Sequence, residues 1–229
     1  AAEAKAISSG GEGVVRIGFA GASSQRAVPM LANAVRRTHP GVELVLQSQT
    51  YVYTAFDELA SGDLDLAFVR TPVTHPELSY RVVEVEDVLC ALPEDHRMAE
   101  QESVRLAELA DDGFVSLPED ARSMLRATMY GMCLTAGFPP RIVQVAPDSA
   151  TVLALVAAGA GVTITLSSVR PAQSVGIVYK PIEGTGPAHL YAAIAWRSDN
   201  TSPALARVLE VSEWALPTPD SYEENINVS

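Results

Sequence analysis

The first half of the chain alternates between two spacings of apolar residues. Every second position is apolar within Val14–Ala20, Val42–Leu46 and Leu64–Arg70, which predicts three strands. Between the strands, apolar residues recur every three or four positions, which predicts helices over about Gln25–Thr38 and Val52–Ser61. Strands and helices that alternate in this way form parallel sheets with right-handed crossovers. This half is therefore expected to fold as a β-α-β-α-β unit.

Residues that favour helix ends support these boundaries. Ser23 and Ser24 offer side-chain oxygens that can cap the first helix, and Pro29 is expected near its first turn, where a missing N–H costs little. Gly62 is expected to end the second helix in the left-handed conformation.

The second half of the chain repeats this alternation. Strands are expected at Val82–Leu92, Ile142–Ala146, Val162–Leu166, Ile177–Tyr179 and Leu190–Trp196. Helices are expected at about Ser123–Ala136 and after a cap at Asp148 or Ser149. A last amphipathic helix is expected to open at Thr201-Ser202-Pro203 and to run through Leu205 to Ala215. The middle helix, TVLALVAA, is apolar on nearly all sides and should be buried. We therefore predict an α/β protein of two small domains, with the cleft between them as the default small-molecule site.

The two ends differ from the rest of the chain. Residues 1–12 are polar and small and are typical of a linker remnant, and residues 217–229 are expected to form a polar tail. The chain does not begin with Met, which suggests a fragment. No stretch approaches 18 apolar residues, so no membrane-spanning segment is expected, and no secretory leader is visible.

Charge and cysteine content exclude several partners and sites. The formal net charge of the 229 residues is -12, and Lys5 and Lys180 are the only lysines. Binding to nucleic acid or to an acidic membrane needs clustered positive charge, so neither is expected of this chain. Cys90 and Cys133 form no CxxC motif, which predicts buried free thiols rather than a disulfide framework or a zinc site. No metal and no cofactor is expected.

Five segments, taken in order, resemble the effector-binding domain of LysR-type transcriptional regulators. They are Val14–Pro29 followed by THPGVELVLQ, the run LASGDLDLAFVR at Leu59–Arg70, Val85–Ala99, Ser149–Ile164 and Ile177–Leu205. The resemblance covers about residues 13–216, and the shared order of the segments carries more weight than any one of them.

The resemblance implies a fold of two Rossmann-like lobes joined by two crossover strands, as in type II periplasmic binding proteins. Regulatory lobe I would comprise residues 13–85 and 191–216, and regulatory lobe II residues 86–190. The crossover strands would lie near Val82–Leu89 and His189–Ala195.

The resemblance also implies a function. The chain would be the ligand-sensing domain of a cytoplasmic DNA-binding regulator and would bind a small anionic effector in the interlobe cleft. DNA would be bound only by an N-terminal winged helix-turn-helix that this chain lacks. The chain would form a homodimer of antiparallel protomers, and the full-length protein a tetramer.

Two other classes of function remain as alternatives. A solute-binding protein of an ABC-type transporter shares the two-lobed fold. An enzyme on this scaffold is not expected, because the GxSxG, HExxH and GxxxxGK[ST] motifs are all absent. The half-fingerprint Gly159-Ala160-Gly161 ends a predicted helix instead of opening one, so it is interpreted as a helix end.

Three places in lobe I are candidates for effector binding. The first holds Ala22, Ser23 and Ser24, where small residues and hydroxyls precede a helix N-terminus that favours anions; plain N-capping is the alternative. The second is the start of the next helix. It holds Thr50, Tyr51 and Val52. There Thr50 or Thr54 could cap the helix, and Tyr51 and Tyr53 could line a ligand or pack on the surface of the lobe.

The third place is Arg70, at the end of the third strand. Ligands of open α/β sheets gather at the carboxyl ends of strands. The resemblance places Arg70 in the effector cleft of family members that sense aromatic-catabolite acids. A salt bridge to an acidic residue of the chain is the alternative role.

Lobe II adds the loop Leu117–Ser123 and the helix start at Asp148–Thr151. From these we select Glu119, Arg122 and Ser149 as effector contacts. Arg122 is a second cation, but Glu119, Asp120 and Asp148 oppose it. The family's loops here are commonly rich in serine, so this acidic loop argues against a simple dicarboxylate effector.

Overall fold

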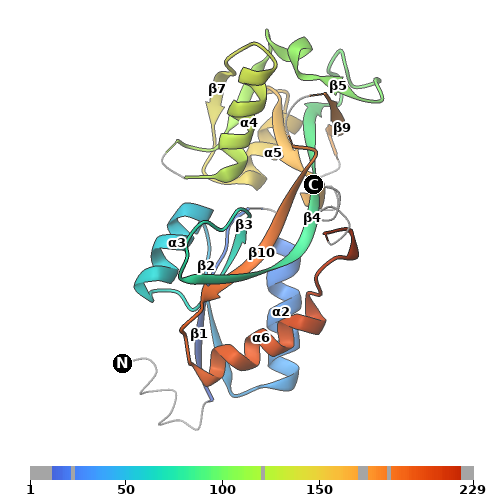
Figure 1. The fold of residues 1–229 in the computed structure, drawn as a ribbon. Helices are drawn as coiled ribbons and strands as arrows, with labels where there is room; N and C mark the ends of the chain where they lie inside the picture. The colour runs from blue at the N-terminus through green and yellow to red at the C-terminus, as the bar shows by residue number, and fades with distance from the viewer. Residues whose placement is uncertain (1–11, 22–23, 120–121, 170–174, 185–186, 223–229) are drawn as a thin grey trace. The chain divides into compact units, whose positions relative to one another are not determined.

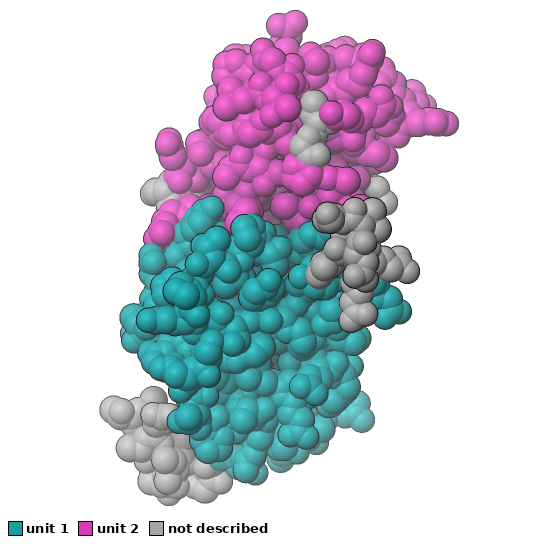
Figure 2. Space-filling view, viewed as in Figure 1, with its two compact units in different colours: residues 1–85, 191–229 teal, residues 86–190 magenta. Residues whose placement is uncertain are grey.

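The computed structural model describes residues 12–21, 24–119, 122–169, 175–184 and 187–222 (Figure 1). The chain divides into two compact units, which Figure 2 shows in different colours. Unit 1 comprises residues 1–85 and 191–229, and unit 2 comprises residues 86–190. Unit 1 is thus built from two separate stretches of the chain.

Unit 1 is a sheet covered by helices on both faces. Its strands are β1 (Gly13–Gly18), β2 (Val42–Gln47), β3 (Leu66–Arg70), the first part of β4 (Leu78–Pro93) and most of β10 (His189–Arg197). Its helices are α2 (Ser24–Thr38), α3 (Val52–Ser61) and α6 (Pro203–Ala215). The strand order is β2-β1-β3-β10-β4. Strand β1 pairs in parallel with β2 and β3, and β10 pairs antiparallel with β3. The predicted parallel β-α-β-α-β arrangement is confirmed.

The alternation of side chains along the strands sorts the helices of unit 1 onto two faces. Val15 and Ile17 of β1 are buried in one cluster with apolar residues of α2 and α6, among them Leu31 and Leu205. α2 and α6 lie side by side in Figure 1. α3 contributes no residue to that cluster and packs on β3. The sheet is therefore buried on both faces, as the apolar run of β3 indicates.

Helix ends in unit 1 confirm one prediction and correct three. Gly62 has φ 81° and its N–H bonds to the carbonyls of Glu58 and Leu59, as expected of a left-handed helix end. Ser24 is the first residue of α2 and does not cap it, because its Oγ donates to the carbonyl of Ala20. Pro29 lies inside α2, beyond the first turn.

The third correction concerns α3. Its N-cap position is Tyr51, which makes no side-chain cap hydrogen bond. Thr50 instead donates its hydroxyl to the carbonyl of Gln47, and Thr54 lies within the helix. Neither threonine therefore caps α3.

Unit 2 holds the remaining elements. They are the second part of β4, β5 (Val104–Arg105), the 3-10 helix η1 (Leu106–Leu109), β6 (Gly113–Ser116), α4 (Met124–Thr135), β7 (Arg141–Val145), α5 (Ser149–Ala157), β8 (Thr163–Leu166), the 3-10 helix η2 (Ser167–Val169) and β9 (Ile177–Glu183). β4 pairs antiparallel with β8 and β9, and β5 pairs in parallel with β9. β6 and β7 form a separate parallel pair. β5 and β6 had not been predicted.

The core of unit 2 is built from both sheets and α4. Its largest buried side chains include Phe114, Leu92 and Met129, each at most 2% exposed. Cys90 and Cys133 are buried in the same core and form no disulfide. Burial raises the pKa of Cys133 to about 11 and raises that of Cys90 as well, so both thiols stay protonated at neutral pH.

Both main helices of unit 2 begin at a capping side chain. Ser123 Oγ accepts from the N–H of Arg126, and Asp148 Oδ1 accepts from the N–H of Thr151 at 2.9 Å. Asp148 is therefore the cap of α5, the first of the two residues predicted for this role. Such caps each contribute about 1 kcal/mol.

Gly161 allows two backbones to approach closely. Its φ is 154°, and a Cβ there would lie 2.4 Å from the carbonyl oxygen of Gly113. The following residue, Val162, donates its N–H to that oxygen at 2.8 Å. Gly159–Gly161 thus ends α5 and leads into a strand, as the sequence indicated.

The described part of the polar tail makes one ring contact. Tyr222 lies edge-on to Tyr191, with ring centroids 5.1 Å apart. Through this contact the described part of the tail packs on β10 of unit 1. Within the described ranges, no helix has both the length and the apolar character that a membrane crossing needs.

Candidate functional site

In unit 1, three of the predicted effector contacts meet at one edge of the sheet. β1, β2 and β3 are parallel neighbours, so their carboxyl ends lie at the same edge. Ser24 follows β1, Thr50 follows β2 and Arg70 is the last residue of β3. This edge is where ligands of open α/β sheets gather.

The two hydroxyls at this edge donate hydrogen bonds to backbone carbonyls of the same unit. Ser24 Oγ donates to the carbonyl of Ala20 at 2.9 Å, and Thr50 Oγ1 donates to that of Gln47 at 3.3 Å. Both side chains are buried, at 4% and 2% exposure. A ligand would therefore meet their oxygens as acceptors rather than as donors.

The other predicted residues of unit 1 differ in access. Tyr51 and Arg70 are half-buried, while Val52 is buried as the first residue of α3. The side chain of Val52 is thus part of the buried core of unit 1. Ala22 and Ser23 lie outside the described residues. Tyr53, the second predicted tyrosine, packs edge-on against Phe56 with ring centroids 6.4 Å apart.

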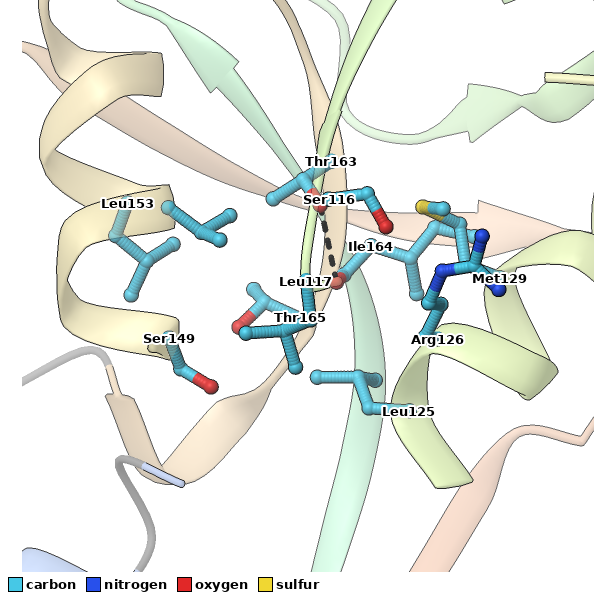
Figure 3. A pocket seen from close by; sticks show the side chains of 11 residues that line it. Ser116, Leu117, Leu125, Arg126, Met129, Ser149, Leu153, Thr163, Ile164 and Thr165 are labelled. Carbon is cyan, nitrogen blue, oxygen red and sulfur yellow. Dashed lines mark hydrogen bonds between the residues drawn. The ribbon is translucent and has the colours of Figure 1, made fainter. Parts of the chain in front are cut away.

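Unit 2 contains a pocket of its own. It lies past the carboxyl end of β6, between the N-terminal halves of α4 and α5, and β8 forms its floor (Figure 3). Its apolar wall comes mainly from the two helices, with Leu125 and Met129 on α4 and Val152 and Leu153 on α5. Its polar residues are Ser116, Arg126, Ser149, Thr163 and Thr165.

The pocket is small. The space open to a water-sized group is about 20 Å³, and one water needs roughly 10–15 Å³. One small polar group fits inside, and the rest of any larger ligand would lie at the mouth.

Of the predicted contacts in unit 2, the structure places only Ser149 at this pocket. Glu119 is 90% exposed, and Arg122 is exposed with φ 51°. The cation at the pocket is instead Arg126, in the first turn of α4, which sequence reasoning had missed.

A signal for Arg126 was present in the sequence. Met129 and Cys133 follow it at three and seven positions, and both are buried. Residues at these spacings share one helix face, so Arg126 continues a buried stripe. An arginine in such a stripe needs a partner or a ligand.

The guanidinium of Arg126 is held from one side. Its Nη2 donates to Tyr130 Oη at 3.3 Å, and its Cζ lies 4.4 Å from the centre of the Tyr130 ring. Glu119 Oε2 is 3.9 Å from Nη2. Within the described residues, no group of three or more His, Cys, Asp or Glu could hold a metal ion. The chemistry available at the pocket is therefore hydrogen bonding and charge.

Comparisons with known proteins identify the family. The profile described as LysR substrate binding domain matches residues 8–214. The regulator ShiR of Corynebacterium glutamicum (strain R), an HTH-type transcriptional regulator, is 36% identical over 200 residues. That match covers 87% of this chain and 68% of ShiR.

Solved structures agree on the fold. The effector-binding domain of QuiR in complex with shikimate has a TM-score of 0.76 at 17% identity, covering 89% of this chain and 95% of that one. The BenM effector-binding domain with benzoate has a TM-score of 0.72 at 22% identity, covering 90% and 95%. Full-length CbnR complexed with its target DNA has a TM-score of 0.74 at 24% identity, covering 93% of this chain and 74% of CbnR.

The fold predicted from the resemblance, that of type II periplasmic binding proteins, is therefore confirmed. The relatives favour a regulator over the transporter alternative, because they are transcriptional regulators. On the family profile and on the match to ShiR, this chain belongs to the LysR substrate-binding-domain family and is the effector-binding domain of a LysR-type transcriptional regulator.

Proposed function

We propose that this domain senses a small metabolite that carries an anionic group, and that the sensed state controls DNA binding in a longer protein. The observation that carries the proposal is the family match over residues 8–214, which spans both units. Two structural neighbours are described with shikimate and benzoate, which are both small carboxylates. The proposed role is regulatory and not enzymatic.

The anionic character of the effector is supported by Arg70 in unit 1. Arg70 ends β3 at the edge of the sheet from which the chain also leads from β1 into α2 and from β2 into α3. Helix N-termini and guanidinium groups both favour anions. In this proposal, Arg70 binds the negatively charged group of the effector, and the main chain at Ser24 and Thr50 makes further contacts.

DNA binding belongs to a part of the protein outside this chain. The net charge of -12 is unsuited to a phosphate backbone, whereas full-length CbnR is described with its target DNA. A regulator of this kind works on DNA, so the cytoplasm is the compartment that the proposal implies.

A second copy of this chain is the proposed protein partner. Each unit carries exposed apolar residues on a strand at the edge of its sheet: Val45 and Leu46 on β2, and Val143 and Val145 on β7. Met30 on α2 and Leu134 on α4 extend these two patches. Exposed apolar edge strands are normally covered. In the proposed antiparallel homodimer, β2 and α2 of one protomer cover α4 and β7 of the other.

Light scattering tests the dimer. The mass of one chain is 24.3 kDa, and a species of twice that mass is expected at tens of micromolar. Leu46→Glu should shift it toward the monomer, while Val175→Glu, an exposed change outside both patches, should not. A wild-type monomer at these concentrations contradicts the proposed dimer.

Two measurements test the regulatory function. A gel shift with the full-length gene product should show sequence-specific DNA binding, and residues 1–229 alone should show none. A thermal-shift screen of small organic acids should then find an effector. A ligand at a hundred times its Kd stabilises the fold by about 2.7 kcal/mol, a Tm rise of roughly 5–10 °C for this length. An effector that is neutral or cationic contradicts the anionic assignment.

A further inference from the structure

Two buried polar atoms in the pocket of unit 2 lack a hydrogen-bond partner among the described residues. They are the Oγ of Ser116 and the Nε of Arg126. Ser116 is 3% exposed, so bulk water does not reach its side chain freely. In folded proteins, buried polar groups nearly always have partners. Two such atoms at one pocket indicate that the pocket receives a group that supplies the missing bonds.

Both atoms face the same part of the pocket. Figure 3 shows the Ser116 hydroxyl and the Arg126 guanidinium on the same side, next to Met129. The hydroxyl of Thr163, which also lines the pocket, differs from that of Ser116 in this respect. The Oγ1 of Thr163 donates to the carbonyl of Ile164 at 3.5 Å.

Tyr130 fixes the orientation of the arginine. Its hydroxyl accepts a hydrogen bond from Nη2, and its ring packs against the guanidinium. Tyr130 therefore occupies Nη2 and leaves Nε without a partner in the described part of the chain. Glu119 approaches Nη2 at 3.9 Å, and its 90% exposure places it in solvent. The Nε–H is therefore the part of the group that is left for a pocket occupant.

The chemistry of the two atoms defines this occupant. An arginine Nε–H can only donate, and a serine hydroxyl can donate as well. The occupant must then offer an acceptor, and the positive charge favours an anionic one. The apolar wall of Leu125, Met129 and Leu153 excludes water and strengthens this preference. The available space of about 20 Å³ suits one head group.

We propose that Arg126 and Ser116 anchor a single carboxylate group of the effector, with Tyr130 as a positioning residue. This inference rests on the proposed function, because it assumes that the domain binds an anionic effector. It adds a recognition pair in unit 2, distinct from Arg70 in unit 1. Arg126 and Ser116 thereby select an organic acid over its neutral amide or ester.

The first experiment uses formate as a probe of the carboxylate group alone. The ¹⁵N-labelled wild-type chain is titrated with sodium formate, and the Nε–H resonance of Arg126 is followed by NMR. The resonance is assigned from its absence in the spectrum of Arg126→Lys. Sodium chloride at equal ionic strength and neutral formamide serve as reference titrations. A saturable shift with formate, at least tenfold weaker with formamide, is expected.

Variants then separate the roles of the residues. Ser116→Ala should weaken formate binding about tenfold, as expected for the loss of one hydrogen bond to a charged group. Tyr130→Phe keeps the ring and should weaken it less. Arg36→Gln changes an exposed arginine of α2 and should leave the titration unchanged.

The outcomes are distinguishable. If the Nε–H of Arg126 responds to formate no more than to chloride, the anchor does not exist, whatever the full-length protein does with DNA. If the anchor binds formate but the full-length protein shows no effector-dependent DNA binding, the proposed function fails and the carboxylate site stands. Formate is titrated into wild-type protein, so Ser116→Ala and Tyr130→Phe are not needed to detect the anchor, and Arg126→Lys serves only to assign the resonance.

Discussion

The two units place polar side chains at the carboxyl ends of their strands, but they use them differently. In unit 1, the hydroxyls of Ser24 and Thr50 donate hydrogen bonds to nearby backbone carbonyls. In unit 2, Ser116 Oγ and Arg126 Nε are buried without a partner among the described residues. The hydroxyls at the sheet edge of unit 1 therefore contribute to the stability of the fold. The two unpartnered atoms in the pocket of unit 2 are left to form hydrogen bonds with a ligand. The comparison shows that equivalent strand ends can serve either folding or binding.

The largest expected effect comes from the core of unit 2. Phe114→Ala removes a fully buried ring and should lower the free energy of unfolding by about 3–5 kcal/mol. Urea unfolding followed by far-UV circular dichroism measures this loss.

The same variant, Phe114→Ala, tests whether the two units unfold together or independently. Both tryptophans, Trp196 and Trp214, belong to unit 1, so their fluorescence reports on that unit. Because β4 and β10 contribute residues to both units, we expect the fluorescence transition to move together with the dichroism. A fluorescence transition that stays in place would mean that the units unfold independently.

The next largest effect concerns effector binding in unit 1. Arg70→Ala should weaken binding of an acidic effector roughly ten- to a hundredfold, since a charge-assisted pair contributes about 1.5–3 kcal/mol. Isothermal calorimetry with the effector found by screening measures this, with Arg36→Ala as the matched control. Equal affinity of wild type and Arg70→Ala would assign Arg70 a purely structural role.

The helix caps offer a further contrast between the units. α5 in unit 2 begins at Asp148, which bonds to the N–H of Thr151 at 2.9 Å and to its hydroxyl at 3.0 Å. α3 in unit 1 begins without a side-chain cap. Asp148→Ala should cost about 1 kcal/mol in urea unfolding, while Asp148→Asn keeps an acceptor and should cost little. Similar losses for both variants would show that the charge, and not the cap, matters.

A gain of stability is expected at Gly131. It lies within α4, and a Cβ there would meet nothing within 4 Å. Gly131→Ala should therefore raise the free energy of unfolding by about 0.5–1 kcal/mol. Gly161→Ala is the opposite case, because its Cβ would collide with the carbonyl of Gly113. A loss at Gly131 in thermal melts would indicate that the partner protomer of the proposed dimer packs closely against this face of α4.

The smallest effect depends on pH. Burial favours a higher pKa for Asp112, but hydrogen bonds from Arg97 and His96 outweigh it, so the pKa of this carboxyl is lowered. A lowered pKa stabilises the fold above the pKa of the unfolded chain, and this contribution is lost as the pH falls through the folded value.

Such a partly exposed pair contributes less than about 1 kcal/mol. Thermal melts between neutral and acidic pH should show Arg97→Gln less stable than wild type near pH 7 and equal to it at acidic pH. A difference that persists unchanged in acid would point to lost packing of the Arg97 side chain.

Much of the fold could be predicted because its signals are local. The alternation in β1–β3 and the left-handed Gly62 follow from spacing and from backbone preference. β6 was missed because its four residues, Gly113–Ser116, are too few for a periodic signal and depend on pairing with β7. Pro29 was misplaced because it is the sixth residue of a helix that begins at Ser24, so it falls in the second turn.

The site was harder to predict because it depends on contacts distant in sequence. Arg122 was chosen from the loop composition, but its backbone has φ 51° and its side chain is exposed. Arg126 lies four residues later and reaches the pocket because α4 turns it toward Ser116 and β8. Which of two nearby arginines faces a pocket is decided by helix phase and packing, and composition carries no information about either.

Strand order in unit 1 has a consequence for the growing chain on the ribosome. β10 lies between β3 and β4, yet β3 ends at Arg70 and β10 begins only at His189. At translation rates of about 5–20 residues per second, this centre strand arrives on the order of ten seconds after its neighbour β3. Until then β3 has an unpaired apolar edge, which is a target for chaperones, while all of unit 2 has already emerged and can fold. The nascent protein would thus complete its inserted unit before the unit that begins and ends the chain.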